Sequence, residues 1–319
     1  MTNAALLGSF GDVGGGPLVF RNKLINGGMA VDQRNAGATQ TFTAAAALAY
    51  SVDRWYGYCT GANATGARIA GTGSQFAYRF TGAASVTAIG FAQRIEQLNS
   101  YSLAGQTATL SVDLANSLLT TVTWTAYYAN TADTFGSLAS PTKTSIATGT
   151  FTVTSTVTRY QAQITVPAAA TTGIEILFTV GAQTSGTWTI QNAQLEAGSL
   201  PTPFEQRPIG MELDLCRRYF ESGVCVGPAS SVLIVIPYYP KRIISINSVT
   251  TTARTTSNLW NISDAYFGIG ISTISYTGVG TLSEAADGIG IVYANGIIVR
   301  TPTALATFNR ISFAFSAEL

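Results

Sequence analysis

The side chains that most often perform acid–base catalysis are scarce in this chain. It has no histidine in 319 residues, and charged residues make up only 10% of it, against about a quarter in ordinary soluble domains. Histidine is the commonest general base and the commonest metal ligand, so its absence removes the usual route to both chemistries. We therefore expect a protein that binds and assembles, with no catalytic residue, no metal and no cofactor.

Carboxylates are the remaining candidates for chemistry. A glycosidase needs two carboxyl groups about 5 to 9.5 Å apart, and no sequence spacing ties any two of them together here. The candidates are Glu96, Asp113, Glu175 and Glu196. Cleavage of a glycoside therefore stays open as an alternative to binding.

Aromatic side chains offer a different chemistry, the binding of sugars. Tyr127 and Tyr128 lie near the end of an expected strand, with Trp124 close by. Aromatic faces stack on the C–H faces of sugar rings, and neighbouring amides and arginines supply hydrogen bonds. Strand aromatics also fill cores, so the alternative is that these rings are interior. Trp260, farther along the chain, is a further candidate.

These residues must be positioned by strands, because alternation of period two dominates residues 18–207. Phe76, Tyr78 and Phe80 share one face of an expected strand, and residues 174–180 repeat the pattern. Many such strands, separated by turns, predict a mostly-β fold. We expect a jelly roll or β-sandwich, followed by a short helix and a second, smaller β module.

Composition divides the chain into four parts. Residues 1–17 are Gly-rich and aperiodic, which favours an N-terminal docking arm. Residues 18–200 form the expected jelly-roll domain, residues 201–221 a Pro-rich linker and short helix, and residues 222–319 a C-terminal β domain. The linker is expected to be extended, because each proline biases the residue before it away from helix.

The expected helix has an apolar face and a charged one. Met211, Leu215 and Tyr219 fall on one face, at i, i+4 and i+8. Other positions carry charges at spacings that allow ion pairs, on the surface or at an interface. These are Glu212, Asp214, Arg217 and Arg218.

Two further motifs combine charged and aromatic side chains. We expect Asp53, Arg54 and Trp55 to open a strand, with Trp55 in the core and the two charged residues paired with loops. The alternative is that Trp55 is a platform under a sugar ring. Glu205 and Arg207, in the linker, are expected to clamp it to a neighbouring module.

Cysteines, charge and hydropathy exclude several classes of partner. Cys59, Cys216 and Cys225 are odd in number and lack C-x-x-C spacing, which predicts reduced thiols. A net charge of +1 without a basic cluster predicts no nucleic-acid partner. No apolar run reaches the roughly 18 residues that cross a bilayer, and residues 1–7 do not resemble a secretory signal.

Five groups of short sequence segments, in order along nearly the whole chain, carry a resemblance to a known family. They are LINGGM, DQR and SVDRW at 24–29, 32–34 and 51–55; QNAQLEAG and TPFEQRP at 191–198 and 202–208; ELDLCRRYF at 212–220; PYYPKR at 237–242; and SAEL at 316–319. Together they resemble a family of tailed-bacteriophage tail-fibre and related virion proteins. That resemblance implies a jelly roll similar to carbohydrate-binding modules, a companion C-terminal module and attachment to host surfaces as homotrimers.

The resemblance sets the functional expectation. We expect a tail fibre or baseplate-associated fibre, located in the virion tail and assembled in the host cytoplasm, that holds host-surface saccharides by multivalent binding without turnover. Other tail or baseplate proteins would dock on the N-terminal arm. The alternatives are a depolymerase of host polysaccharide and a capsid-decorating fibre.

Sedimentation tests the expected oligomer. Mean hydropathy is +0.26, which is high for a chain with no expected membrane span, so apolar surface should be buried between subunits. We expect one trimeric species that survives dilution to micromolar concentration. A single 33.3 kDa species would contradict it, whereas a dimer would contradict only the symmetry.

Overall fold

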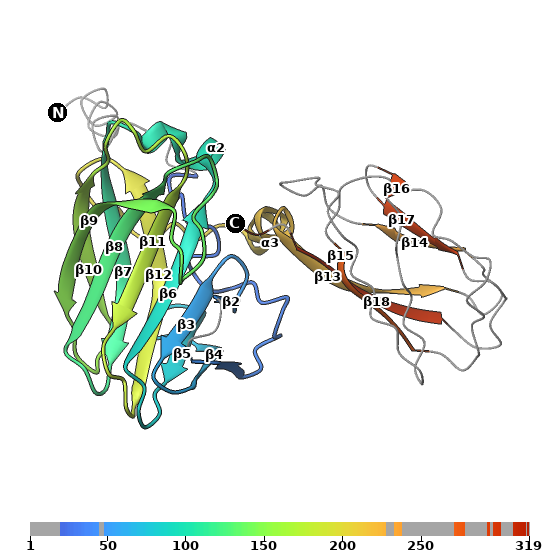
Figure 1. Cartoon of the computed structure of the whole chain (residues 1–319), viewed down its shortest axis with the longest axis horizontal. Helices are drawn as coiled ribbons and strands as arrows, with labels where there is room; N and C mark the ends of the chain where they lie inside the picture. The colour runs from blue at the N-terminus through green and yellow to red at the C-terminus, as the bar shows by residue number, and fades with distance from the viewer. Residues whose placement is uncertain are drawn as a thin grey trace, which may run out of the picture. The chain divides into compact units, whose positions relative to one another are not determined.

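The computed structural model describes residues 20–44, 48–227, 233–237, 271–277, 292–293, 296–300, 309–316 and 318, with side chains up to residue 222 and at 318. The expected arm at residues 1–17 and the candidate Trp260 lie outside these ranges. The chain divides into two compact units, residues 1–212 with 319, and residues 213–318. Figure 1 draws both units.

The first unit is a sandwich of two antiparallel sheets. In the first sheet the strand order is β1 (Gln40–Phe42), β4 (Ala64–Ala70), β5 (Phe76–Thr81), β12 (Thr187–Ala197), β7 (Thr107–Asn116) and β10 (Thr158–Thr165). In the second sheet it is β2 (Ala49–Tyr50), β3 (Tyr56–Thr60), β6 (Ala88–Ile95), β11 (Ile174–Val180), β8 (Thr121–Ala129) and β9 (Lys143–Thr152).

Eight of these strands follow the jelly-roll order. From β5 to β12 the chain lays down 5-12-7-10 in the first sheet and 6-11-8-9 in the second, which is the pattern of two Greek keys in a double-sheet jelly roll. β1 and β4 extend one sheet at its edge, and β2 and β3 extend the other. The expected mostly-β sandwich with a short helix is confirmed.

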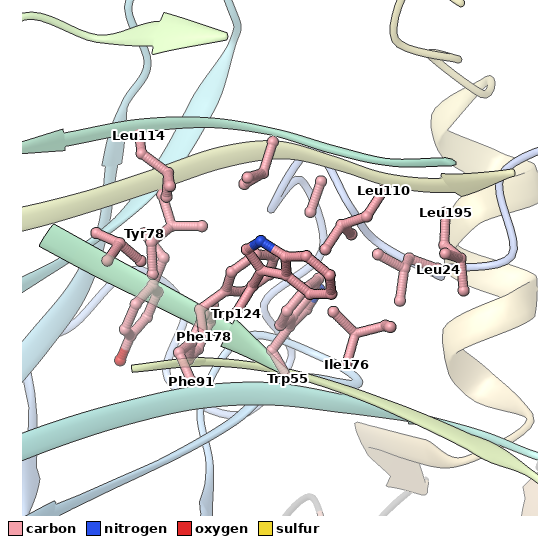
Figure 2. Close-up of a cluster of buried hydrophobic side chains, with 14 of the residues drawn as sticks. Leu24, Trp55, Tyr78, Phe91, Leu110, Leu114, Trp124, Ile176, Phe178 and Leu195 are labelled. Carbon is pink, nitrogen blue, oxygen red and sulfur yellow. The ribbon is translucent and has the colours of Figure 1, made fainter. Parts of the chain in front are cut away.

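The core consists of the two inner faces, which are joined by stacked rings (Figure 2). Phe91 of the second sheet stacks on Trp55 at 4.9 Å between ring centroids and on Tyr78 of the first sheet at 5.0 Å. Phe80 stacks on Trp188 at 5.5 Å. At most 2% of any of these side chains is exposed, and burial of each large ring stabilises the fold by about 2–3 kcal/mol.

The expectation that residues 53–55 open a strand is wrong in detail. They belong to a turn before β3, in which Arg54 has a φ of 72° and the Trp55 N–H donates to the Val52 carbonyl at 3.0 Å. Strict alternation would place Val52 and Trp55 on opposite faces, but the turn brings both into the core with 0% exposure.

Asp53 and Arg54 hold this turn in place from buried positions. The Asp53 carboxylate accepts the backbone N–H of Gln33 at 3.0 Å and its side-chain amide as well. Arg54, of which 1% is exposed, donates from Nη2 to the Arg94 carbonyl at 2.5 Å. The two charges therefore orient the loop that delivers Trp55 to the core.

Three short helices complete the described chain. α2 (Gln97–Ser100) and η1 (Tyr101–Leu103) join β6 to β7, and α3 (Ile209–Arg217) follows the linker. The buried positions of α3 are Glu212 and Cys216, whereas Met211 is 42% exposed and Tyr219 is buried beyond the helix end. The expected face of Met211, Leu215 and Tyr219 is therefore wrong. Among helices in the described ranges, none is long and apolar enough to span a membrane.

The second unit contains two small antiparallel sheets. At the end of α3, the guanidinium of Arg217 lies 3.7 Å from the carboxylate of Asp214 and 3.7 Å from that of Glu221. The backbone N–H of Arg218 donates to the Asp214 carbonyl. The strands are ordered β13 (Phe220–Gly227), β18 (Asn309–Ser316) and β15 (Ile271–Thr277) in one sheet, and β14 (Leu233–Pro237), β17 (Gly296–Arg300) and β16 (Val292–Tyr293) in the other.

Two cysteines have described side chains, and Cys59 is a free thiol. Cys59 and Cys216 are both buried, and the Cys59 thiol donates to the Phe42 carbonyl at 3.1 Å. Burial raises the pKa of Cys59 above its ordinary value, so the reactive thiolate form is disfavoured. The side chain of Cys225 lies outside the described residues.

Glu205 and Arg207 bind the linker to the first residues of the sandwich. The Glu205 carboxylate accepts the backbone N–H of Phe20 and, at 2.7 Å, that of Asn22. Arg207 donates to the Asn22 carbonyl and, at 3.3 Å, to the Leu24 carbonyl. We call these contacts the linker clamp; it joins segments more than 180 residues apart.

Glu212 extends the linker clamp from the first turn of α3. Its carboxylate lies 3.3 Å from Arg207 and accepts the backbone N–H of Asn26 at 2.5 Å. Burial raises the pKa of Glu212, against the opposing effect of Arg207. The sandwich is therefore bonded to residue 212, past the prolines of the linker.

Two fragments test the linker clamp. Residues 18–217 should be more stable in urea than residues 18–207 by about 1.5–3 kcal/mol, because the shorter fragment leaves the buried Asn26 N–H and Arg207 without Glu212. Glu212→Gln in the longer fragment should reproduce most of that loss. Equal midpoints for the two fragments would contradict the role of Glu212.

Candidate functional site

The aromatic residues singled out by sequence do not share one surface. Trp124 is 6% exposed and packs on Phe151 in the core, with ring centroids 6.3 Å apart (Figure 2). Tyr128 also packs against the core. Tyr127 faces the other way, onto the outer face of the second sheet. Trp260 lies outside the described residues. Of the four, Tyr127 is the ring that the structure places on an outer surface.

Tyr127 belongs to a larger cluster, which we call the tyrosine face. Sheet surfaces that point to solvent are usually polar, but here four partly or wholly buried tyrosines gather around two buried apolar side chains. The tyrosine face consists of Leu48, Tyr50, Tyr56, Tyr58, Ala92, Tyr127 and Leu177. Such a grouping outside the main core marks a surface suited to binding.

Strand register arranges these residues in rows across the second sheet. The middle row consists of Tyr50, Tyr56, Ala92 and Leu177, which are partners on four neighbouring strands. On one side the next row places Tyr58 beside Gly90. On the other side it consists of Arg94, Glu175 and Tyr127. The buried Ala92 and Leu177 therefore lie in the row between Tyr58 and Tyr127, whose partly exposed rings pack against this buried cluster.

Tyr58 lies over a glycine. A Cβ added to Gly90 would be 2.2 Å from Tyr58 Cε1 and 2.3 Å from its Cζ, closer than any real side-chain carbon approaches a neighbour. The absence of a side chain at Gly90 thus lets the ring lie down across the strand. A ring in this position offers its outer face to a ligand.

Three charged side chains lie at one end of the tyrosine face. Glu175 is completely buried, and its carboxylate lies 2.9 Å from Nε of Arg94 and in contact with Nζ of Lys143. The Lys143 ammonium also sits 4.2 Å from the centre of the Tyr127 ring. Arg94 lies 5.1 Å from that of Tyr56. These contacts fix the tilt of both rings through cation–π attraction.

Burial changes the titration of the tyrosines. It raises the pKa of Tyr58 to about 12, with Tyr127 and Glu175 adding to the effect. It also raises the pKa of Tyr56 well above the ordinary value, and a hydrogen bond to Glu175 contributes. Both phenols are therefore protonated at neutral pH, when each can donate one hydrogen bond and accept others.

Sequence reasoning found Tyr127 but missed Tyr50, Tyr56 and Tyr58. A signal was present, because Tyr56 and Tyr58 alternate along one strand on the face opposite the core residues Gly57 and Cys59. The sequence did not predict that Tyr56 and Tyr58 lie on the same surface as Tyr127, because their strands, β3 and β8, are separated in the sheet by β6 and β11.

Comparisons with known proteins find structural likenesses at low sequence identity. No family model and no curated protein matches the chain. The tailspike protein 4 enzymatically active domain of bacteriophage CBA120 aligns over 56% of this chain and 22% of its own, with 17% identity and a TM-score of 0.36. The chain thus spans about a fifth of that structure.

Two binding modules align over most of their own length. TmCBM61, solved with β-1,4-galactotriose, aligns over 56% of this chain and 99% of its own, with 12% identity and a TM-score of 0.35. The C-terminal family 22 carbohydrate binding module of Clostridium thermocellum Xyn10B aligns over 48% and 91%, with 13% identity and a TM-score of 0.34. Likenesses this distant do not say what this chain binds.

Glu175→Gln tests the charge cluster. Removing the carboxylate leaves Arg94 and Lys143 buried without their counter-ion, which should cost about 3–5 kcal/mol of unfolding free energy in urea. The control is Asp214→Asn, whose exposed pair with Arg217 should contribute less than about 1 kcal/mol. A loss as small as the control's would mean that solvent already screens Glu175.

Proposed function

We propose that this protein binds glycans without cleaving them, and that the tyrosine face is the binding surface. The observation that carries the proposal is the pair of partly exposed rings, Tyr58 and Tyr127, which pack against a buried cluster on the outer face of the second sheet. A sugar ring has an apolar face of C–H groups and an equatorial rim of hydroxyls. The tyrosine face has a complementary arrangement of ring faces and polar groups.

Polar groups beside the rings would bind the sugar hydroxyls. The protonated phenol of Tyr58, which is partly exposed, can both donate and accept hydrogen bonds, whereas that of Tyr56 is buried and bonded to Glu175. Across the same outer face Thr123 pairs with Thr179, and Thr125 pairs with Leu177. Each such hydrogen bond replaces one to water, so it contributes only about 0.5–1.5 kcal/mol. We therefore expect weak binding at each site, roughly micromolar to millimolar.

The absence of cleavage is part of the proposal. Glycoside hydrolysis uses two carboxyl groups, one of them protonated as the acid. The carboxylate that belongs to this surface is Glu175, which is buried and engaged by Arg94 and Lys143. Its two oxygens are each in contact with one of these cations, so neither is free to reach a glycosidic oxygen. The alternative, a depolymerase, would need a carboxyl pair elsewhere in the chain.

We infer further that the protein is a virion component, a tail fibre or baseplate-associated fibre. The inference rests on the ordered sequence motifs that resemble that family; a capsid-decorating fibre is the alternative. A homotrimer would present three tyrosine faces, and weak contacts at three sites gain avidity through effective concentration. Weak binding at each site would then be sufficient for attachment to a host surface rich in repeated sugars.

Ring deletion tests the proposed surface. Tyr58→Ala and Tyr127→Ala should each weaken binding to an array of bacterial polysaccharides about fivefold to tenfold, because each removes a stacking contact of roughly 1 kcal/mol. Gly90→Ala should have a similar effect, since the added Cβ displaces the Tyr58 ring. The matched control is Tyr101→Ala, which removes a tyrosine that is 65% exposed on η1.

The outcomes separate binding from cleavage. If the three variants fold and bind like the wild type, the tyrosine face is not the site. If the wild type releases reducing ends from a bound polysaccharide, the protein is a depolymerase and the non-catalytic reading is wrong.

A further inference from the structure

The opposite side of the sandwich carries a hollow that the tyrosine face does not use. It lies on the outer face of the first sheet and encloses about 300 Å³. Its floor crosses three strands, where Arg79, Thr189 and Ala115 are partners in register. Thr72, from the turn between β4 and β5, lines it on one side, and Val157, from the loop between β9 and β10, is a further lining residue. We propose that this hollow is a second binding site, for a sugar unit that carries a carboxylate.

The hollow owes its depth to small side chains at its centre. Ala115 and Thr189 occupy the floor, where β7 and β12 are paired in the middle of the sheet. The next outward-facing pair along the same two strands is Asp113 and Gln191, which are longer. The change from long to short side chains leaves a depression without breaking the sheet. Its shape is therefore set by the rigid strands.

A hydrogen-bonded wall keeps the hollow open. The amide of Gln191 donates to the Thr72 carbonyl at 2.7 Å and accepts the Thr72 N–H at 3.1 Å. These two bonds hold the turn between β4 and β5 in place beside the floor. A site that is already ordered loses less conformational entropy when a ligand binds.

Arg79 gives the hollow its charge. It is the one charged residue among those that line the hollow. The residue is exposed, and its side chain makes no hydrogen bond or ion pair with any residue in the described ranges. The acidic group on the adjoining row is already engaged: Asp113 lies 3.0 Å from Nη1 of Arg159 and accepts a hydrogen bond from Asn192 at 2.7 Å. The guanidinium of Arg79 is thus available to an anion from outside.

The remaining lining selects a sugar among anions. Thr187, Thr189 and Ser117 contribute hydroxyl groups, and Ile69 and Val157 contribute apolar surface. Hydroxyls can both donate to and accept from sugar hydroxyls, and a guanidinium binds a carboxylate through two parallel hydrogen bonds. A volume of about 300 Å³ is at the small end of ligand sites, which fits one or two sugar units.

The second site goes beyond the proposed function, because it lies on a different sheet and adds a charge requirement. The tyrosine face would bind sugars by stacking, whereas the hollow would require a carboxylate. A chain with both sites can engage an acidic polysaccharide at two places on one domain. Variants at one site should leave the other intact, so the two proposals can fail separately.

Titration with single sugars, followed by NMR of the full-length protein, tests the inference. Sodium D-glucuronate should give saturation transfer and shift the backbone amide signals of Thr187 and Thr189, whereas D-glucose should bind at least about tenfold more weakly. Arg79→Gln should weaken glucuronate binding about tenfold, because it removes the charge that pairs with the carboxylate. Ala115→Gln should abolish binding by filling the floor while keeping the charge.

The controls separate a sugar site from a site for any anion. Arg217→Gln removes the same charge from the other unit and should leave the glucuronate-induced shifts of the Thr187 and Thr189 amides unchanged. Sodium acetate and sodium phosphate serve as anions without a sugar ring. If either shifts the same amides as strongly as glucuronate, the hollow is a general anion site. If glucose shifts the Thr187 and Thr189 amides as strongly as glucuronate, or if Arg79→Gln leaves those shifts unchanged, the proposal is overturned.

Discussion

Burial of the inner faces of the two sheets is the constraint on which the sandwich depends. The two sheets of the sandwich pack through their inner faces, where Phe91 stacks on both Trp55 and Tyr78. A strand exposes alternate residues on opposite sides, so a strand that supplies the core leaves its other residues for the surface. Both proposed sites use those residues. The same β8 that places Trp124 in the core places Tyr127 on the tyrosine face.

Local pattern predicted most of the fold and little of the sites. Alternation predicted strands such as β11, because its inner residues are all apolar and nothing local opposes a strand. Alternation failed to predict the turn at Arg54, because the positive φ of this residue is imposed by distant partners and arginine as a residue type does not favour it. It also could not say which face of β8 is buried, because both faces carry aromatic rings. That choice depends on neighbouring strands, which lie far away in the sequence.

Charge is used sparingly, and most of it organises structure. Glu175 joins β11 to Lys143 at the start of β9, and Asp113 joins β7 to Arg159 of β10. The pair of Asp113 and Arg159 joins neighbouring strands, whereas that of Glu175 and Lys143 spans the intervening β8, and both resist changes of register. Because these charged side chains are paired within the fold, Arg79 differs from them: its side chain has no partner in the described ranges. In a chain with 10% charged residues, a free cation in a hollow is a specific feature against a neutral background.

The linker clamp has a mechanical consequence. Because Glu205 and Arg207 are bonded to residues 20–24, the chain enters and leaves the sandwich at the same place. Tension applied between the N-terminal segment and the second unit therefore loads the clamp and not the sheets. The jelly roll therefore lies outside the load-bearing part of the chain, and the two proposed binding surfaces keep their geometry under load until the clamp itself ruptures.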